Sequence, residues 1–288
     1  MRTQELALAK INLALDILGR RADGYHELRM VMQTVSLCDV ITVEEGGTGF
    51  TLLTGEAFSL PADKVSMEQR AAEAFFAALG VPVPPLTVRL EKNIPAFAGL
   101  GGGSADVAAL LRCLRRLYAA GMPDEALRAI GLTVGSDVPF CVSGGTSLAE
   151  GRGERLTDLP PLPVCQIVLC KPDFGISTPE LFVLADGAVL SKRPDIAGLT
   201  AALQGGELTG VTDRLCNVFE EFLPERYREV FRIKEILLAH GALNAAMSGS
   251  GPTVYGIFES AAEAQRAAEV LKKSYQQTYV AKPVKKLV

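Results

Sequence analysis

Four glycines stand within five residues in the segment AGLGGGSADVAALL, residues 98–111, directly before an apolar run with helical spacing. Glycine has the most backbone freedom to lose, so such a cluster marks a sharp bend or a close approach to another group. A helix that starts there presents unpaired N–H groups and the positive end of its dipole. The pattern therefore predicts a binding site for an anion such as phosphate, with Ser104 as the helix N-cap or as a hydroxyl contact to the phosphate or its metal.

Two better-known phosphate loops do not match this segment. Counted from Gly99, the dinucleotide-binding fingerprint requires glycine at the position of Ser104, and the P-loop requires a lysine that does not follow here. The alternative is a tight turn between a strand and a helix. Because one or two glycines are enough for such a turn, the larger cluster favours the anion site.

Periodic patterns predict the elements that must position this loop. Apolar residues alternate over residues 6–17 and predict a strand whose other face holds Lys10, Asn12 and Asp16. A second strand is expected over residues 31–43, which are rich in valine, threonine and isoleucine. The first strand thus combines an apolar face with a partly polar one.

A helix is expected over residues 66–79, since Ser66 and Gln69 have capping-box spacing and Gly80 follows the last apolar position. The proline-rich segment 157–163 predicts a linker, because proline disrupts helices and ladders. Before this linker, the sequence predicts a loop and then strand-like, turn-rich sequence over residues 131–154. The other expected elements are strands at residues 86–92, 167–171 and 253–258 and helices beginning at the glycine cluster and near residues 124, 227 and 261.

The mixed order of helices and strands predicts an α+β fold with two domains, residues 1–160 and 161–288. With 48% apolar and 22% charged residues, the composition is that of a folded globular protein. A net charge of -4, with basic and acidic residues interspersed, excludes nucleic acid as an expected partner.

Membrane insertion and secretion are not expected, because the chain lacks an apolar run of about 18 residues and a signal-peptide cleavage pattern. Six irregularly spaced cysteines and two histidines argue against a disulfide framework and a zinc site. We therefore expect a cytoplasmic protein with a small-molecule partner, and the sequence leaves monomer and homodimer open.

Four segments follow one another in the order typical of the GHMP superfamily of small-molecule kinases, which the chain resembles over nearly its full length. These segments are AKINLAL, PAFAGLGGGSAD, GSDVPF and MSGSGPTVY. The resemblance implies a two-domain GHMP kinase fold, with a ribosomal-protein-S5-like N-terminal domain that binds ATP and a ferredoxin-like C-terminal domain that binds substrate. Residues 19–41, GRRADGYHELRMVMQTVSLCDVI, are similar to the branch that phosphorylates the 2-hydroxyl of 4-diphosphocytidyl-2-C-methyl-D-erythritol in the non-mevalonate isoprenoid pathway.

By this resemblance, Lys10 and Asp137 are the catalytic pair, and Asn12 lies near the substrate phosphates. Tyr25, His26 and Phe182 would hold the cytidine, and residues 248–253 would line the site from the second domain. ATP phosphates would be wrapped by the segment that we call the glycine loop: Pro95, Ala96, Phe97, Ala98, Gly99, Leu100, Gly101, Gly102, Gly103, Ser104 and Ala105. Magnesium would be held mainly by the ATP phosphates, since the sequence contains no evident carboxylate cage for it.

The chemistry of the pair is consistent with phosphoryl transfer to an alcohol. A carboxylate such as Asp137 is a weak base, so it needs a cation such as Lys10 to favour the developing alkoxide. Taken singly, each residue has an ordinary alternative: a strand lysine that reaches solvent, and a turn or helix-capping aspartate. For Tyr25 and His26 the alternative is a turn after Asp-Gly.

Two departures from the superfamily pattern affect individual contacts. Ala105 replaces a second serine of the loop, and Val107 replaces the first of two alanines. Ser66 and Met67 stand where relatives often have Asn-Leu near the adenine. The competing functions are another GHMP kinase, acting on homoserine or mevalonate, and a catalytically silent metabolite-binding regulator of the same fold.

Overall fold

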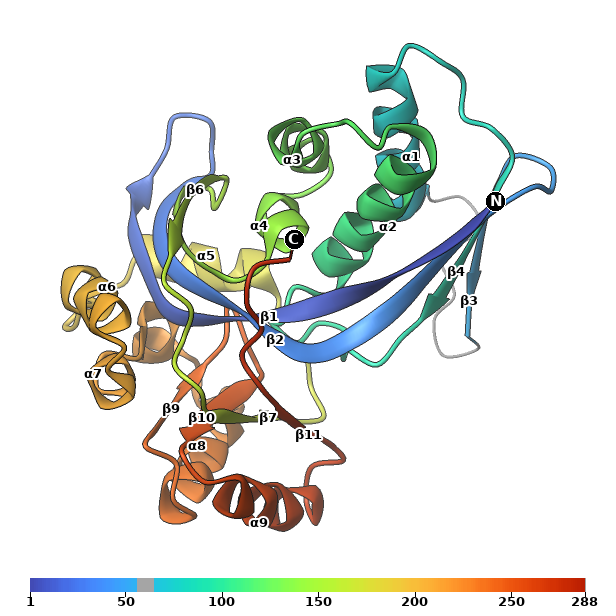
Figure 1. Cartoon of the computed structure of the whole chain (residues 1–288). Helices are drawn as coiled ribbons and strands as arrows, with labels where there is room; N and C mark the ends of the chain where they lie inside the picture. Colours follow the sequence, from blue (N-terminus) through green and yellow to red (C-terminus); the bar gives the residue numbers. More distant parts are fainter. Residues whose placement is uncertain (56–64, 288) are drawn as a thin grey trace.

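The computed structural model describes residues 1–55 and 65–287, which are built around two β-sheets (Figure 1). Within these residues, the first sheet has seven strands in the order β3-β4-β2-β1-β8, with β5 paired to β2 and β6 to β5. Its strands are β1 (Arg2–Arg20), β2 (His26–Glu45), β3 (Phe50–Thr54), β4 (Leu86–Glu91), β5 (Thr146–Gly151), β6 (Arg155–Leu159) and β8 (Cys216–Asn217). The second sheet has the order β11-β7-β10-β9, with β7 (Gln166–Lys171), β9 (Asn244–Met247), β10 (Val254–Phe258) and β11 (Gln277–Ala281).

The helices pack in separate groups around these sheets. In Figure 1, α1 to α4 lie above the long strands, while α8 and α9 lie beside the second sheet. The helices of the first group are α1 (Met67–Ala78), α2 (Gly102–Tyr118), α3 (Asp124–Leu132) and α4 (Val138–Ser143). The remaining helices are α5 (Thr178–Asp186), α6 (Ile196–Gly205), α7 (Leu208–Thr212), α8 (Glu229–Ala239) and α9 (Ala261–Lys272), with 3-10 turns at Val218–Phe222 and Glu225–Tyr227.

The long hairpin of β1 and β2 holds several of the predicted site residues, from Lys10 and Asn12 on β1 to His26 at the start of β2. The strands pair from Arg2 opposite Glu44 to Arg20 opposite His26, with register shifts between Leu8 and Lys10, Asn12 and Ala14, and Ile17 and Gly19. Such irregularities bend a strand and re-aim its side chains. The shifts therefore fall where polar residues of β1 must point into the protein.

Both faces of the middle of β1 are buried. The alternating apolar positions are buried as predicted, but Lys10, Asn12 and Asp16 on the partly polar face are also only 1–6% exposed. The alternative of a lysine that reaches solvent is thus wrong for Lys10. The physical reason is that neighbouring elements cover this face, which the pattern of one strand cannot reveal.

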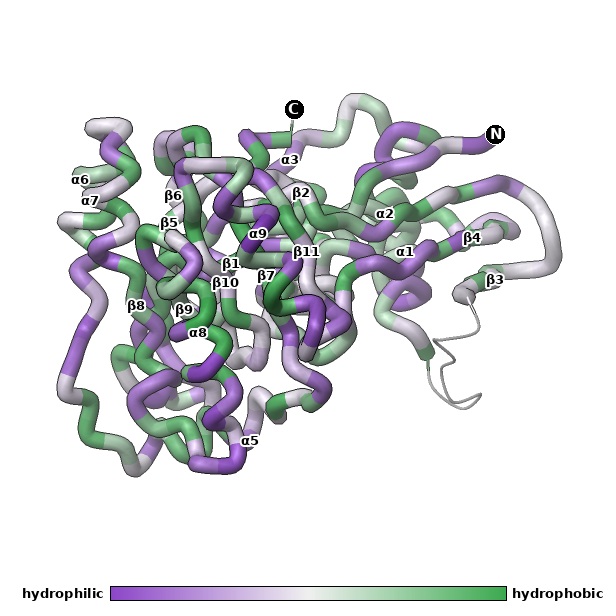
Figure 2. Tube along the Cα trace, turned by 90° about the horizontal axis from the view of Figure 1, so that it is seen from below, coloured by the Kyte–Doolittle hydropathy of each residue, from purple (hydrophilic) through white to green (hydrophobic). Residues whose placement is uncertain are grey.

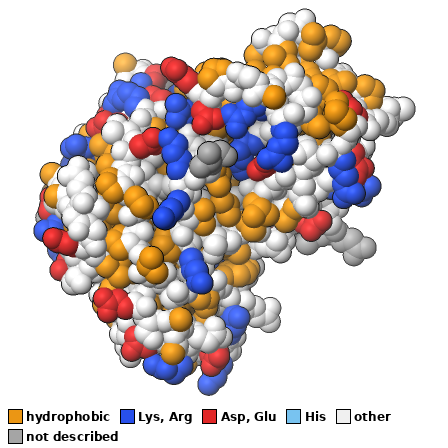
Figure 3. All heavy atoms as spheres, in the orientation of Figure 1, with side chains coloured by type: hydrophobic (Ala, Val, Ile, Leu, Met, Phe, Trp, Pro, Cys, Tyr) orange, Lys and Arg blue, Asp and Glu red, His pale blue; other side chains and the backbone are white. Residues whose placement is uncertain are grey.

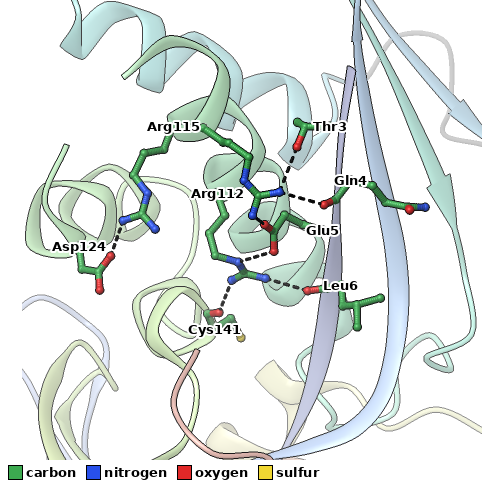
Figure 4. Close-up of polar contacts among 9 residues, drawn as sticks. Thr3, Gln4, Glu5, Leu6, Arg112, Arg115, Asp124 and Cys141 are labelled. Carbon is green, nitrogen blue, oxygen red and sulfur yellow. Dashed lines mark hydrogen bonds and ion pairs between the residues drawn. The ribbon is translucent and has the colours of Figure 1, made fainter. Parts of the chain in front are cut away.

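Arginines on α2 fix this helix against the start of β1 and against α4 (Figure 4). Arg112 is buried, and its guanidinium donates to the carbonyls of Leu6 (2.7 Å) and Cys141 (2.8 Å) and pairs with Glu5 (3.3 Å). Arg116 pairs with the same glutamate. A buried charge is stable only when paired and hydrogen-bonded, so these contacts set the position of α2 relative to β1 and α4.

Several local predictions are confirmed, and others are wrong. The Ser66 hydroxyl accepts a hydrogen bond from the Gln69 N–H at 3.0 Å and caps α1 as predicted. The loop expected in residues 131–154 contains α4, whose proline at the start is compatible with a helical first turn. The predicted linker at 157–163 begins too early, because its first three residues belong to β6.

The chain leaves the first sheet after Leu159 and enters the second at Gln166, and β8 later returns to pair with β1 in parallel. The domain boundary at residue 160 stays a prediction. No helix in the described part of the chain is long and apolar enough to cross a bilayer. Hydrophobic and hydrophilic stretches alternate along the tube in Figure 2.

Candidate active site

Lys10 and Asp137, predicted as a catalytic pair, lie next to each other. The Lys10 Nζ is 3.4 Å from Oδ2 of Asp137, which immediately precedes α4. The lysine side chain is 6% exposed and the aspartate side chain is 30% exposed. Although Asp137 occupies the N-cap position of α4, its side chain makes no capping hydrogen bond, so the carboxylate is available for other contacts.

Asn12 is a second partner of the Lys10 ammonium, besides Asp137. The Lys10 Nζ donates to the Asn12 Oδ1 at 2.8 Å, and the Asn12 amide contacts the Met30 sulfur at 3.4 Å. The buried hydroxyl of Tyr255 on β10 donates to the Asn12 carbonyl at 2.8 Å. These contacts fix a buried cation and connect the second sheet to it.

The glycine loop passes directly over the stem of Lys10. Gly101 has φ +69 and precedes α2, and a Cβ added there would lie 3.0 Å from the Lys10 Cγ. The first helical N–H groups, on Gly102, Gly103 and Ser104, precede the first intrahelical hydrogen bond from Ala105 to the Gly101 carbonyl, and the first turn contains no acidic residue. This is the arrangement that suits an anion.

The structure corrects one role of Ser104. Gly101 is the N-cap of α2, and Ser104 is the third residue of the helix, so its hydroxyl does not cap the helix. The reason is that the left-handed conformation of Gly101 lets the helix begin immediately after it. The contact of Ser104 with a phosphate or its metal stays a prediction.

Residues 248–253, which we call the second loop, interlock with the glycine loop. The Ser248 hydroxyl donates to the Gly99 carbonyl at 2.9 Å, and a Cβ on Gly99 would lie 2.1 Å from the Ser248 carbonyl oxygen. A Cβ on Gly249 would lie 3.4 Å from the Lys10 Nζ. The approach at Gly99 requires glycine, and the second loop lies against the ammonium of the charged pair. Its role in lining the site stays a prediction.

Asn217 positions the second loop, and the sequence analysis missed it. Its amide donates to the carbonyls of Met247 and Gly249, each at 2.8 Å. It lies on β8, paired with Leu15 of β1. Nothing in its local sequence indicates this role, which depends on a parallel pairing between distant segments.

A cavity of about 750 Å³ opens beside the charged pair. Its lining combines Lys10 and Asp137 with Phe97, Gly99 and Gly101 of the glycine loop. Three other residues of that loop are buried with their side chains in the core: Ala98, Leu100 and Ala105. The remaining ones lie outside the lining of this cavity: Pro95, Ala96, Gly102, Gly103 and Ser104.

Tyr25, His26 and Phe182, predicted to hold a pyrimidine, line the other end of the same cavity. Tyr25 is 53% exposed, and the guanidinium of Arg152 lies 4.7 Å from its ring centroid. The rings of His26 and Phe182 stack on each other, with centroids 4.6 Å apart and an interplanar angle of 18°. Arg152 was missed by the sequence analysis because it lies in a glycine-rich turn that has no chemical pattern of its own.

A buried charged cluster lies behind the start of α2. The Lys92 ammonium pairs with Asp39 and, at 2.6 Å, with Oδ2 of Asp106. The other carboxylate oxygen of Asp106 has no partner among the described residues, and burial raises the pKa of this carboxyl. Asp39 also accepts the Ile94 N–H at 2.7 Å, so the cluster fixes the chain entering the glycine loop.

Comparisons with known proteins agree with this geometry. Residues 67–145 match the family described as GHMP kinases N terminal domain, and residues 200–277 match GHMP kinases C terminal. A crystal structure of 4-(cytidine 5'-diphospho)-2C-methyl-D-erythritol kinase superposes with a TM-score of 0.82 and 32% identity, covering 98% of this chain and 99% of that chain. A homoserine kinase from Cytophaga hutchinsonii has the same fold, with a TM-score of 0.75 and 19% identity over 99% of this chain and 95% of that chain.

The fold and the site therefore define a GHMP kinase, and the predicted fold class is confirmed. The 4-diphosphocytidyl-2-C-methyl-D-erythritol kinase of Caldicellulosiruptor bescii is 40% identical over 92% of this chain and 93% of that protein. The kinase of the same name from Clostridium acetobutylicum is 37% identical over 96% and 99%, respectively. The chain belongs to the 4-diphosphocytidyl-2-C-methyl-D-erythritol kinase family, as the segment at residues 19–41 predicts.

Proposed function

We propose that this protein transfers the terminal phosphoryl group of ATP to the 2-hydroxyl of 4-diphosphocytidyl-2-C-methyl-D-erythritol, giving the 2-phosphate and ADP. The single observation that supports this most is the 3.4 Å contact between Lys10 and Asp137 beside the glycine loop, at one end of a cavity whose other end holds Tyr25 and His26. A phosphate site, an acid–base pair and an aromatic surface are the groups that this reaction needs.

The glycine loop supplies the phosphate site in this proposal. The free N–H groups at the start of α2 and its dipole would bind the ATP phosphates. The side chains of Ala98, Leu100 and Ala105 are buried in the core and anchor the loop, and its backbone would face the nucleotide. A preorganised set of donors lowers the barrier because it does not have to reorganise as charge moves in the transition state.

Lys10 and Asp137 would act on the acceptor hydroxyl. As its oxygen bonds to the γ-phosphorus, the bond to the β-phosphate oxygen breaks, ADP leaves and the hydroxyl proton passes to the Asp137 carboxylate. The Lys10 ammonium, held by Asn12, would stabilise the developing negative charge on the oxygen. Asn12 is buried, so its predicted contact with the substrate phosphates would act mainly through this lysine.

Magnesium fits this site as an ion held mainly by ATP. Among the described residues, no group of three His, Cys, Asp or Glu side chains is arranged to hold a metal. Magnesium often uses one or two protein oxygens and completes its shell with phosphates and water, and the Ser104 hydroxyl of the glycine loop would be one such protein oxygen. When bound, the ion would offset the charge of the triphosphate.

The pyrimidine would be recognised at the far end of the cavity. The exposed ring of Tyr25 offers a stacking surface, and His26 offers hydrogen-bonding nitrogens. Phe182 would complete the aromatic wall, with one of its faces covered by His26. Homoserine and mevalonate lack a pyrimidine, so a kinase for either of them would not need an aromatic surface at this end of the cavity.

The proposed setting is the cytoplasm, with a small molecule as partner and without nucleic acid. On the face shown in Figure 3, acidic and basic side chains are interspersed with hydrophobic ones. Monomer and homodimer remain equally compatible with the proposal.

The direct test incubates purified protein with ATP, magnesium and one of three alcohols: the cytidylated methylerythritol, homoserine or mevalonate. Phosphorylation of the cytidylated compound alone supports the proposal. Phosphorylation of homoserine or mevalonate instead indicates another GHMP kinase. Nucleotide binding without transfer to any of the three indicates a catalytically silent regulator.

A further inference from the structure

Helix α5 presents two side chains to His26 from one of its faces. Phe182 and Asp186 are four residues apart, so they lie one above the other on the helix. The Phe182 ring stacks on the imidazole with centroids 4.6 Å apart. The Asp186 Oδ1 lies 2.8 Å from the His26 Nε2. One contact fixes the plane of the imidazole, and the other fixes its rotation in that plane.

Asp186 contacts the end of the β1–β2 hairpin through both carboxylate oxygens. Its Oδ2 is 3.5 Å from the Arg20 guanidinium, and Arg20 is paired with His26 across the hairpin. Asp186 is absent from the lining of the main cavity and instead lines a smaller hollow behind His26, together with Leu190 and Arg193. Any effect of Asp186 on a molecule in the main cavity must therefore pass through His26.

The contact with Asp186 determines which imidazole nitrogen holds the proton. A carboxylate only accepts hydrogen bonds, so Nε2 must be the N–H donor. In the neutral ring Nδ1 is then an acceptor. An acceptor matches the exocyclic amino group of cytosine and mismatches the carbonyl that uracil has at the same position.

We infer that Asp186 is a positioning residue that holds His26 in the Nε2–H tautomer and in the plane of Phe182, and thereby favours an amino-bearing pyrimidine. This inference rests on the proposed function only in its last step, the choice of pyrimidine. The tautomer and the ring orientation are properties of the free protein.

His240 provides an internal reference for the tautomer. The sequence contains two histidines, and the His240 Nδ1 lies 2.8 Å from the Ile236 carbonyl oxygen. Because a carbonyl only accepts, His240 must have the proton on Nδ1, the opposite tautomer to His26. The imidazole ¹⁵N chemical shifts of the two residues are therefore expected to differ, and H240Q assigns them.

The first experiment measures these ¹⁵N shifts in the wild type, D186A, D186N and R20Q. We expect the Nε2–H tautomer for His26 in the wild type and in R20Q, a mixture in D186A, and an intermediate result in D186N, whose amide oxygen still accepts. His240 should not change in any variant, which also checks that the fold is retained. Wild-type His26 in the Nδ1–H tautomer, or an unchanged His26 spectrum in D186A, overturns the inference.

The second experiment measures kinetics with the cytidylated substrate and its uridine counterpart. For D186A we expect the KM of the cytidylated substrate to rise about fivefold, since one hydrogen bond contributes ~1 kcal/mol, with kcat and the KM for ATP within about twofold of wild type. The preference for cytidine over uridine should fall by a similar factor, and D186N should restore part of it. An equal rise in the KM values of the cytidylated substrate and its uridine counterpart leaves the preference unchanged and contradicts the specificity step. If neither compound is phosphorylated by the wild type, the proposed function fails, and the ¹⁵N measurement still decides the role of Asp186.

Discussion

The Lys10 Nζ, on β1, lies 3.4 Å from the Oδ2 of Asp137, the residue that immediately precedes α4. Arg112 of α2 joins these two elements, because it hydrogen-bonds Leu6 on the strand of Lys10 and Cys141 on the helix that follows Asp137 (Figure 4). Helix α2 therefore contributes to the placement of the charged pair.

The first prediction concerns this pair. Replacing Lys10 by Ala or Asp137 by Asn should each lower kcat by at least about a hundredfold, the usual contribution of a general acid or base, and change the KM for ATP much less. Initial rates of ADP release with saturating substrate measure this. The exposed pair of Lys286 and Asp158 supplies matched controls, since K286A and D158N should leave kcat unchanged. Full activity in K10A or D137N would remove these residues from the mechanism.

The second prediction uses Gly101 to separate backbone strain from contact with Lys10. A Cβ added to Gly101 would stand on left-handed backbone (φ +69) and lie 3.0 Å from the Lys10 Cγ. A Cβ added to Gly80 would also stand on left-handed backbone (φ +72), but in open space. Both G101A and G80A should lose about 1–2 kcal/mol of unfolding free energy, because alanine is disfavoured in left-handed backbone. Only G101A should also displace Lys10 and lower kcat, on the order of tenfold or more.

Urea denaturation and steady-state kinetics on the same two variants measure both effects. Equal kcat losses in G101A and G80A would show that strain alone explains the change. An active G101A would show that Lys10 can shift without cost to the reaction.

Much of the fold was predictable because it depends on short-range patterns. The alternation around Ile11 and the capping box at Ser66 reflect the periods of strand and helix, which neighbouring residues alone determine. The glycine loop was recognisable for a similar reason, since its conformation requires glycine wherever it is placed. The resemblance to GHMP kinases then predicted which of these segments form one site.

The parts that were missed depend on tertiary contacts. The burial of Lys10 results from elements that cover a face of β1, and the loop-positioning role of Asn217 results from pairing between β8 and β1. Helix α4 was hidden by the proline in its first turn and by the glycines beside it, which usually indicate a loop. Asp186 had a readable signal, since it follows Phe182 by one helical turn, but its relevance depends on the placement of His26.

The third prediction concerns Phe97, which has a left-handed backbone although it is not glycine. Its φ is +51, the residue is 82% exposed, and it lines the main cavity. Phe97→Gly removes the backbone penalty and a ring that is buried little in the folded protein. The free energy of unfolding should therefore stay within about 1 kcal/mol of wild type.

Substrate binding should respond differently, because a ring on the cavity wall loses its exposed apolar surface when the cavity is filled. The KM of the cytidylated substrate should rise about five- to tenfold in F97G, corresponding to ~1 kcal/mol of lost burial. V189A, at a position that is 96% exposed and outside the cavity, is the control and should have no effect. An unchanged KM in F97G would show that the ring does not contact the substrate.

The fourth prediction concerns the pH dependence of stability at Asp106. Burial raises the pKa of this carboxyl above its ordinary value of 3.8, although the neighbouring Lys92 opposes the shift. Above pH 3.8 the unfolded chain has released this proton while the folded protein retains it. The contribution of Asp106 to stability is therefore complete below that pH and is lost as the pH rises through the folded pKa.

Asp106→Asn is neutral at every pH and keeps the shape of the side chain. The wild type should lose unfolding free energy relative to D106N as the pH is raised from 5 upward, at up to about 1.4 kcal/mol per pH unit, the limit for one proton. Urea denaturation at pH 5, 6, 7 and 8 measures the difference between the two curves. D158N removes an exposed carboxylate instead and should parallel the wild type. Parallel curves for the wild type and D106N would show that Asp106 is ionised in the folded protein across this range, and that Lys92 outweighs the cost of its burial.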